Sequence, residues 1–512
     1  MAEEKKSRLY ALKPLIERWP AVSKPEGHIT FRTKISWTVL CLTIYFVLTN
    51  LIIFGLKGNV IDMFAGFRAI MAGASGSIMH LGIGPIVTAS IILQLFVGAK
   101  IINLDLTKKE DKAIYQGTQK VLVIVMILVE AVPQVYGYLS PSDSLIGMVG
   151  GGYANLIIIT QLFMGAFLVF LMDELISKWG IGSGISLFIA AGVSQSIFTG
   201  LFNWLPTSVG EYGISNPPAG TIPGTYYLAS HMSLAQMVEG GFEYIFIGHQ
   251  GFQNAIIPLI GTLAIFFVVV YTESSRIELP LAHGKMRGAR GRYPIRLIYA
   301  SNIPVILMAA LLANINMFAL LFYTHPGLKH LPLIGHQWWI GTYPPLSSNP
   351  SAGGAWYLSQ LNGVRGWLLP IMQGGVPGGH APWQYALKVI IYLSIMIFGS
   401  VLFAKFWIET TDMGPRAVAR QIQNSGMQIP GFRRDPRVLG RVLERYIPVV
   451  TVIGGASVGA LAGFADAIGT VGNASGTGLL LTTGIMINLY EQIAKEQAME
   501  MHPVLRGFFG NE

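Results

Sequence analysis

The stretch Leu81-Gly-Ile-Gly-Pro-Ile-Val-Thr-Ala-Ser-Ile-Ile-Leu-Gln-Leu95 is an apolar helix whose first turn is rich in glycine. Lys178-Trp-Gly-Ile-Gly-Ser-Gly-Ile-Ser-Leu-Phe188 has the same character. Each stretch places two β-branched residues four apart, on one helix face: Ile83 with Val87, and Ile181 with Ile185. Interrupted apolar helices often mark a transport path through a membrane. Taken alone, however, such pairs favour ordinary core packing, because Ile and Val at helical spacing are common throughout membrane bundles.

The composition places these helices in a membrane. Of the 512 residues, 52% are hydrophobic and 12% are charged, and the mean hydropathy is +0.52, which lies outside the range of ordinary soluble proteins. The single cysteine, Cys41, can form neither an internal disulfide nor a thiolate metal site. Common nucleotide, zinc-protease and acyl-transfer motifs are absent, so we expect no enzyme, no cofactor and no metal.

Ten stretches are long and apolar enough to cross a bilayer core, which requires about 20 residues per helix. They lie near 35–56, 78–98, 117–138, 153–172, 182–201, 254–273, 294–322, 383–408, 447–467 and 475–493. The sequence therefore predicts an all-α membrane protein with ten transmembrane helices. Their division into halves at 34–201 and 254–493 is compatible with an inverted repeat, but no residue-by-residue similarity supports one.

The distribution of charge gives the orientation. With the amino terminus in the cytoplasm, every Lys and Arg falls in a cytoplasmic segment except Lys57, Arg68, Lys329, Arg365 and Lys388. This bias agrees with the positive-inside rule and puts both termini, 1–33 and 494–512, in the cytoplasm. The basic loops 274–296 and 405–446 are then cytoplasmic, whereas 202–253 and 323–382 lie outside. Residues 8–20 have the mixture of aromatic and basic residues of an interfacial helix.

Three further features lie within the predicted bundle. Residues 60–75 are too short and polar to cross alone, so they form either a re-entrant helix that faces the bundle interior or an ordinary outer loop. Glycines 455, 459 and 463 form a small-residue row that lets another helix approach closely. Glu130 is the one acidic residue near the middle of a span, where charge is costly. Thr88, Asn302 and Asn314 are its candidate partners, in either a structural clasp or a cluster that can part.

Several long segments carry a family resemblance: Leu81–Leu95, Asp173–Gly192, Glu278–Leu307 with Tyr293-Pro-Ile-Arg-Leu-Ile-Tyr-Ala-Ser-Asn-Ile-Pro-Val-Ile306, and Gly431-Phe-Arg433. Together they resemble the SecY family of protein-conducting channels, in its archaeal branch, over residues 28–505. The outer loops 202–253 and 323–382 look longer than this resemblance leads us to expect.

The resemblance implies an hourglass pore between two pseudo-symmetric halves. It implies a ring of apolar side chains that closes the pore, here Ile83, Val87, Ile181, Ile185, Ile306 and Leu481. Such a ring would exclude water and ions. Residues 60–75 would be the plug beneath it. The second, third, seventh and eighth spans would form a lateral gate that carries the polar cluster Thr88, Glu130, Asn302 and Asn314.

The resemblance also implies partners. Residues of the cytoplasmic loops would bind ribosomal RNA phosphates and ribosomal proteins, or else serve only as topology determinants: Lys285, Arg287, Arg290, Arg292, Arg433 and Arg434. Two small single-span subunits of the SecE (gamma) and beta type, secretory polypeptides with their signal sequences, and lipid are further expected partners. The function implied is a passive channel in the cell membrane that exports proteins and releases spanning helices sideways. The alternative, an ion-coupled carrier of a small solute, predicts several buried ionisable residues.

Overall fold

The computed structural model describes residues 8–18, 22–27, 29–57, 71–99, 101–102, 104, 108–208, 210–248, 254–283, 290–296, 302–324, 330, 337–344, 349–375, 379–411, 413–424, 427–428, 436–472 and 474–501. Each of the ten predicted apolar stretches contains one long helix. These helices are α2 (Phe31–Asn50), α4 (Gly84–Gly98), α5 (Lys109–Gly137), α7 (Gly151–Trp179), α8 (Gly184–Phe202), α12 (Ile256–Ser274), α13 (Ile303–Thr324), α16 (Pro382–Thr410), α18 (Pro436–Ile468) and α19 (Gly476–Met501).

Eight of the helices in the described part of the chain are long and apolar enough to span a membrane. The other two of the ten predicted are α4 and α19. Helix α4 has 15 residues, which reach only about 22 Å at 1.5 Å per residue. The second half of α19 carries charged residues such as Glu491 and Lys495. The chain is thus a multi-span helical membrane protein with eight spans by this measure, rather than the predicted ten.

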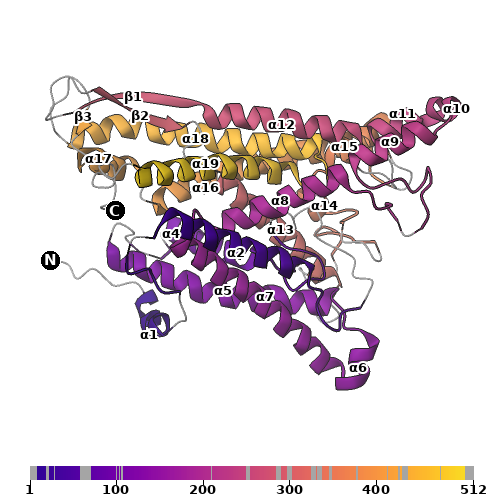
Figure 1. Ribbon diagram of the computed structural model, residues 1–512, viewed down its shortest axis with the longest axis horizontal. Coiled ribbons are helices and arrows are strands. Elements are labelled where there is room, and N and C mark those ends of the chain that lie inside the picture. The colour runs from indigo at the N-terminus through magenta and orange to yellow at the C-terminus, as the bar shows by residue number, and fades with distance from the viewer. Residues whose placement is uncertain are drawn as a thin grey trace.

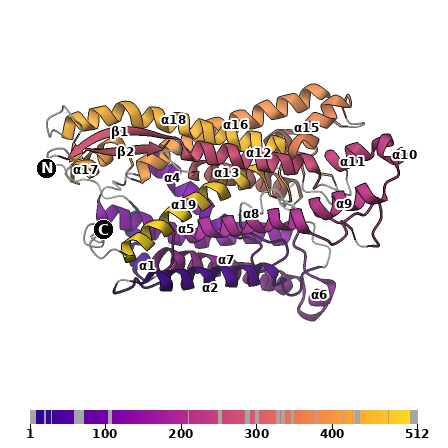
Figure 2. The ribbon, with the colours of Figure 1, turned by 45° about the horizontal axis from the view of Figure 1, so that its top comes forward.

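The helices form two layers with a shared centre. Figures 1 and 2 show α2, α5 and α7 in one layer and α12, α16 and α18 in the other, with α4 and α13 between them. One large apolar core joins residues of both layers, including Ile127 of α5, Phe188 of α8 and Phe403 of α16. Helices α16 and α18 pack so closely that a Cβ added to Gly459 would lie 2.5 Å from the Met396 carbonyl oxygen. The glycine row therefore has the packing role predicted from its spacing.

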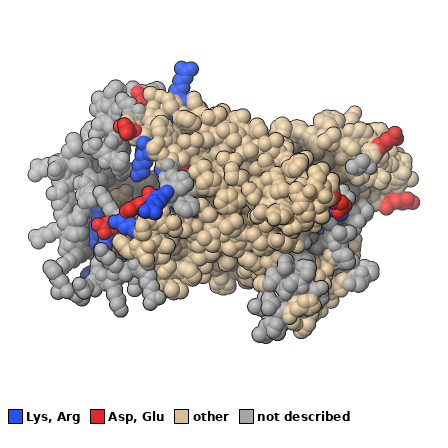
Figure 3. All heavy atoms as spheres, turned by 90° about the horizontal axis from the view of Figure 1, so that it is seen from below, with Lys and Arg blue, Asp and Glu red and all other residues tan. Residues whose placement is uncertain are grey.

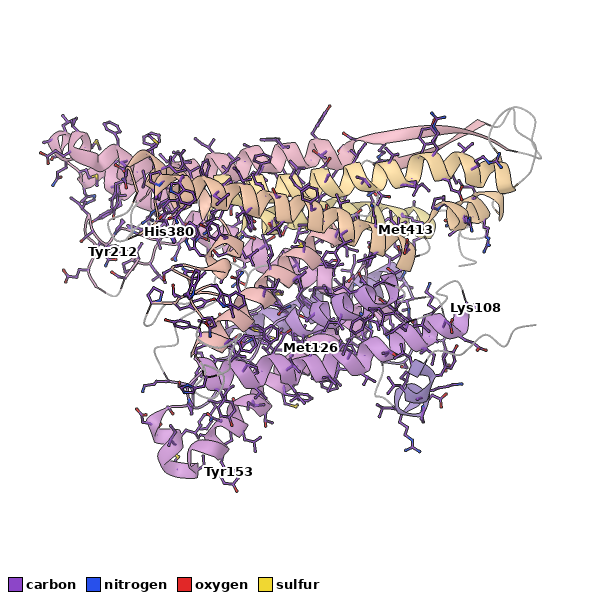
Figure 4. The ribbon with its side chains drawn as sticks, turned by 180° about the vertical axis from the view of Figure 1, so that it is seen from behind. Lys108, Met126, Tyr153, Tyr212, His380 and Met413 are labelled. Carbon is purple, nitrogen blue, oxygen red and sulfur yellow. The ribbon has the colours of Figure 1, made fainter. Side chains whose placement is uncertain are left out.

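Charge lies at the ends of the molecule. On the face in Figure 3, an uncharged band separates an end with Lys, Arg, Asp and Glu from an end whose visible charges are acidic. Lys108 and Met413 lie toward the first end, and Tyr153, Tyr212 and His380 lie toward the second (Figure 4). Lys34 at the start of α2 pairs with Glu496 near the end of α19. The start of the first predicted span and the end of the last therefore lie on the same side.

A small antiparallel sheet extends the first end and was not predicted. Strand β1 (Arg276–His283) pairs with β2 (Arg290–Arg296), and β3 (Met427–Gln428) pairs with β1. The two predicted cytoplasmic loops thus meet in one sheet rather than forming separate loops. Helix α17 (Pro415–Asn424) lies in the second of these loops and packs against α18.

The outer segments contain short helices. The segment after α8 contains α9 (Thr221–His231), α10 (Leu234–Gln236), the π-helical turn η2 (Met237–Gly241) and α11 (Phe242–Phe246). The segment before α16 contains α14 (Gly354–Leu358) and α15 (Gly363–Met372), and α6 (Asp143–Val149) precedes α7. Residues 323–382 are rich in Gly, Pro, Trp and Ser without a clear period, which predicts an irregular loop. The described part of this segment is instead partly helical.

The amino-terminal helix predicted at 8–20 is present as η1 (Arg8–Leu12) and α1 (Lys13–Glu17). Tyr10 donates a hydrogen bond to Asp111 at the start of α5, and this bond raises the pKa of Tyr10 to about 12. A Cβ added at Gly117 would collide with the Ile16 side chain. Helix α1 therefore packs directly on α5.

Candidate functional site

Hydrogen bonds join the two ends of the connection between α2 and α4. The Ile53 N–H donates to the Gly76 carbonyl oxygen at 2.9 Å, and the Ile78 N–H donates to the Leu51 carbonyl oxygen at 2.8 Å. Most of the segment predicted to be re-entrant lies outside the described residues, since the description resumes at Met71. The two flanks are nevertheless paired, so the connection, called the excursion below, has a closed base.

The end of this excursion contacts the start of α4. The Ile83 N–H donates to the Met71 carbonyl oxygen at 2.7 Å, and the Tyr45 hydroxyl of α2 donates to the Ala72 carbonyl oxygen at 3.0 Å. A Cβ on Gly82, whose φ is +54°, would collide with the Met71 carbonyl oxygen. Glycine at position 82 is therefore required for this close approach.

The six apolar residues predicted to form a ring are buried or partly buried. Ile83, Val87, Ile306 and Leu481 belong to the central apolar core, and Ile185 packs against it. These five come from both predicted halves of the chain. Ile181 is 5% exposed but is not part of that core. Its N–H donates instead to the Thr38 hydroxyl of α2 at 3.0 Å.

Three of the four residues of the predicted polar cluster meet between α4, α5 and α13. The Thr88 hydroxyl lies 2.9 Å from Glu130 Oε1 and 2.9 Å from the Gly84 carbonyl oxygen. The same hydroxyl accepts a hydrogen bond from Asn314 Nδ2 at 2.9 Å. Glu130 is 4% exposed, so its carboxylate is held almost wholly inside the protein.

Asn302 does not belong to this cluster, contrary to the prediction. Its Nδ2 donates to Glu273 Oε1 of α12 at 2.7 Å, and a Cβ on Gly484 of α19 would collide with it. Asn302 lies 12 residues before Asn314, which is about 18 Å along a helix axis. The two asparagines therefore serve separate contacts.

A second polar chain, which the sequence analysis did not identify, lies beside the first. Gln134 is four residues after Glu130, and its Nε2 donates to Met317 Sδ of α13 at 3.6 Å. The Tyr138 hydroxyl donates to Gln134 Oε1 at 2.8 Å, and His80 Nε2 lies 3.1 Å from that hydroxyl. The spacing of Glu130 and Gln134 on one helix face was the sequence signal for this chain.

Two further buried groups were also missed. Lys388 of α16 is 8% exposed, and its Nζ donates to the Ser359 hydroxyl at 2.9 Å and lies 4.8 Å from the centre of the Trp356 ring. Asp466 of α18 accepts from Gln360, Tyr392 and Thr477. Both groups join elements within the second half: Lys388 joins α16 to the outer segment, and Asp466 joins α18 to the outer segment, α16 and α19.

Of the six basic residues predicted to bind a ribosome, four lie outside the part of the chain that the structure describes. Lys285, Arg287, Arg433 and Arg434 are outside the described residues. Arg290 and Arg292 belong to strand β2, opposite Ala282 and Pro280 of β1. These two are therefore part of the small sheet. It extends the end of the molecule where Figure 3 shows Lys and Arg beside Asp and Glu, called the basic end below.

The start of α4 brings three features together. Ile83 belongs to the apolar core and bonds to Met71 at the end of the excursion, and the Gly84 carbonyl oxygen lies 2.9 Å from the Thr88 hydroxyl of the polar contact. Among the described residues, no group of three or more His, Cys, Asp and Glu side chains could hold a metal ion.

Comparison with known proteins identifies the family. The SecY family profile matches residues 77–490, and the profile for the plug domain of Sec61p matches residues 44–76. The SecY translocase subunit of Archaeoglobus fulgidus is 46% identical, with 99% of each chain covered. That of Methanocaldococcus jannaschii is 38% identical, with 96% of this chain and 98% of the relative covered. The full-length match to the A. fulgidus protein shows that the outer loops are not unusually long for a relative.

Solved structures agree with the sequence comparison. The chain resembles "The structure of a protein conducting channel" with a TM-score of 0.74 and 36% identity, and 96% of this chain and 98% of that chain are covered. It resembles the Sec61 chain of a canine ribosome-channel complex with a TM-score of 0.71 and 36% identity, at the same coverage. The resemblance inferred from the sequence motifs is confirmed: the chain belongs to the SecY family, whose members are protein-conducting channel subunits of the protein translocase and not enzymes.

Proposed function

We propose that the chain conducts unfolded polypeptides through a pore between residues 34–201 and 254–493, and that Ile83, Val87, Ile181, Ile185, Ile306 and Leu481 close this pore. The observation that carries the proposal is the buried apolar cluster to which both halves contribute and against which the described end of the excursion, at Met71, lies. An apolar constriction excludes water and ions and offers a passing chain no fixed charge to bind. Passage is then independent of the sequence of the chain.

Residues 60–75 act as the plug of this channel. The hydrogen bond from the Ile83 N–H to the Met71 carbonyl oxygen supports a resting position against the ring. The paired flanks at Ile53 and Gly76 form the base of the plug. The ten helices of the two halves, including the short α4 and the polar α19, surround the pore in an hourglass.

The polar contact between α4, α5 and α13 is the closed state of a lateral gate. Interhelical hydrogen bonds in membranes contribute on average only about 0.6 kcal/mol each, so Thr88, Glu130 and Asn314 hold the gate shut weakly. An apolar signal sequence or spanning helix can then part the helices and enter the lipid. The protein resides in the cell membrane, with both termini in the cytoplasm.

The partners follow from the family and from the charge at the basic end. Related chains are described in a canine ribosome-channel complex and in the yeast Ssh1 complex bound to the 80S ribosome. Lys285, Arg287, Arg290, Arg292, Arg433 and Arg434 would bind ribosomal phosphates here, in a manner that weakens with salt. Two small single-span translocase subunits complete the assembly.

Crosslinking from the pore tests the proposal. Because Cys41 is the single native cysteine, its removal leaves only the introduced thiol to react. Cys41 is replaced with Ser, one Cys is placed at Val87, and crosslinking is measured to a Cys in a stalled, ribosome-attached secretory chain. We expect a crosslink that requires a functional signal sequence. A matched control carries the Cys at Tyr153, which is 71% exposed on α7. A ring assignment would be wrong if inserted chains crosslinked at neither Val87, Ile185 nor Ile306.

A further inference from the structure

We propose that His80, Tyr138 and Gln134 form a relay that couples the base of the plug to helix α13, so that release of the plug and opening of the gate are linked. This inference rests on the proposed function, because it assigns a role to residues between the proposed plug and gate. It differs from the Thr88–Glu130–Asn314 contact, which does not reach the plug base.

The relay is continuous from one half of the molecule to the other. The Gly76 N–H, at the closed base of the excursion, donates to His80 Nδ1 at 3.0 Å. His80 Nε2 lies 3.1 Å from the Tyr138 hydroxyl, which donates to Gln134 Oε1 at 2.8 Å. Gln134 Nε2 then donates to Met317 Sδ of α13 at 3.6 Å. His80, Gln134 and Met317 are each no more than 8% exposed.

The hydrogen bonds of the relay all have one direction. A backbone N–H can only donate, so His80 Nδ1 must accept and Nε2 must carry the proton in the neutral ring. Nε2 therefore donates to the Tyr138 oxygen, whose own proton goes to Gln134. Bonds aligned head to tail strengthen one another. Loss of any one member should thus weaken the whole relay.

The relay and the Glu130 contact form two polar rungs between α5 and α13. Gln134 is four residues after Glu130 on α5, and Met317 is three residues after Asn314 on α13, so each pair shares a helix face. The rung that ends at Met317 uses a long hydrogen bond to sulfur, which is a weak acceptor. When α13 moves away, this bond breaks, and the Tyr138–His80 part no longer connects the plug base to α13.

The test uses single-oxygen changes and two readouts on the whole translocase in membranes. Export of a reporter with a weakly apolar signal reports the gate, and ion conductance without a translocating chain reports the plug. Tyr138→Phe removes the central hydroxyl with little change in volume. We expect about a fivefold rise in both readouts, which corresponds to about 1 kcal/mol. Tyr153→Phe, an exposed tyrosine on α7, is the matched control and should change neither.

Two more variants separate the relay from a general loss of packing. His80→Gln keeps an acceptor and a donor and should behave nearly as the parent protein, whereas His80→Phe should behave as Tyr138→Phe. The double variant His80→Phe with Tyr138→Phe should exceed neither single variant, because both interrupt one relay.

The outcomes distinguish the coupling from the proposed function. A rise in weak-signal export without a rise in conductance would overturn the coupling, as would fully additive effects in the double variant or no effect of Tyr138→Phe. Failure of the parent protein to export a strongly apolar signal reporter would instead contradict the proposed function.

Discussion

At the scale of single residues, Ala72 is the one non-glycine residue among those described with a positive φ, +51°. The left-handed conformation costs a residue with a Cβ about 1–2 kcal/mol, so the resting end of the plug is strained. Ala72→Gly should relieve this strain and hold the plug more firmly, since Tyr45 still donates to its carbonyl oxygen. We expect export of a weak-signal reporter to fall by about threefold, the change for under 1 kcal/mol.

The control for this prediction is Ala74→Gly, two residues further along the same segment. Ala74 has no positive φ, so glycine there adds freedom without relieving strain. It should leave export unchanged or raise it slightly. An equal fall in both variants would mean that flexibility, and not the conformation of Ala72, controls the resting plug.

Thr88 is the node of the gate cluster, because its hydroxyl contacts both Glu130 and Asn314. Thr88→Val keeps the shape and removes both hydrogen bonds, which takes this partner from the buried Glu130 and the partly buried Asn314. We expect the gate to open more readily, by about 1 kcal/mol or fivefold in weak-signal export. Thr43→Val on α2 is the control, since the exposed Thr43 hydroxyl bonds only within its own helix at the Val39 carbonyl oxygen. Unchanged export in Thr88→Val would remove the cluster from the gate.

Residue type alone predicted some members of the polar cluster around Glu130, whereas the others depend on distances that the sequence does not give. A lone buried Glu130 predicted polar partners on neighbouring helices, and Thr88 and Asn314 are such partners. Asn302 was assigned by residue type alone, and its distance along the helix excludes it. Gln134 was missed because its partner is the sulfur of Met317, which hydropathy counts as apolar.

At the scale of elements, strand β2 presents Arg290 and Arg292 in the small sheet at the basic end. If each binds one ribosomal phosphate, replacing both with Gln should weaken ribosome binding. It should also lower the slope of log affinity against log salt by about 1.4–1.8. The measurement is co-sedimentation of ribosomes with translocase membranes between about 50 and 200 mM salt, a range over which the affinity of phosphate contacts falls strongly. Arg416→Gln, whose side chain pairs with Glu444 on α18, is the control. An unchanged slope would leave these arginines as topology determinants.

The elements also show what a sequence pattern can predict. Apolar length predicted every long helix from α2 to α19, because the bilayer demands long apolar runs and helices satisfy their own backbone groups. The strands β1 and β2 were not predicted, since they lie in a polar connection that the apolar pattern does not describe. The contact of β1 with β3 joins segments more than 130 residues apart in sequence. The length of α4 was overestimated because residues 78–83, although apolar, form turns before the helix begins.

At the scale of the whole molecule, the two halves meet along a seam that must part if the gate is to open. Helix α4 of the first half contacts α16 of the second: a Cβ on Gly98 would lie 2.6 Å from Phe406 Cδ1. Helices α13 and α16, both in the second half, are in contact where a Cβ on Gly399 would meet Met308 Sδ. The first contact lies across the seam and the second lies within one half.

Disulfides at these two places distinguish movement of the halves from a general effect of crosslinking. In a Cys41→Ser background, the pair Gly98→Cys with Phe406→Cys should form a disulfide, since the side chains are adjacent. Oxidation should then block export and lateral release by at least tenfold, and a reductant should restore both. The pair Met308→Cys with Gly399→Cys joins helices that move together and should leave both activities within about twofold. Full export through the oxidised Gly98–Phe406 pair would show that α4 and α16 stay together during transport, so the gate would have to lie elsewhere in the molecule.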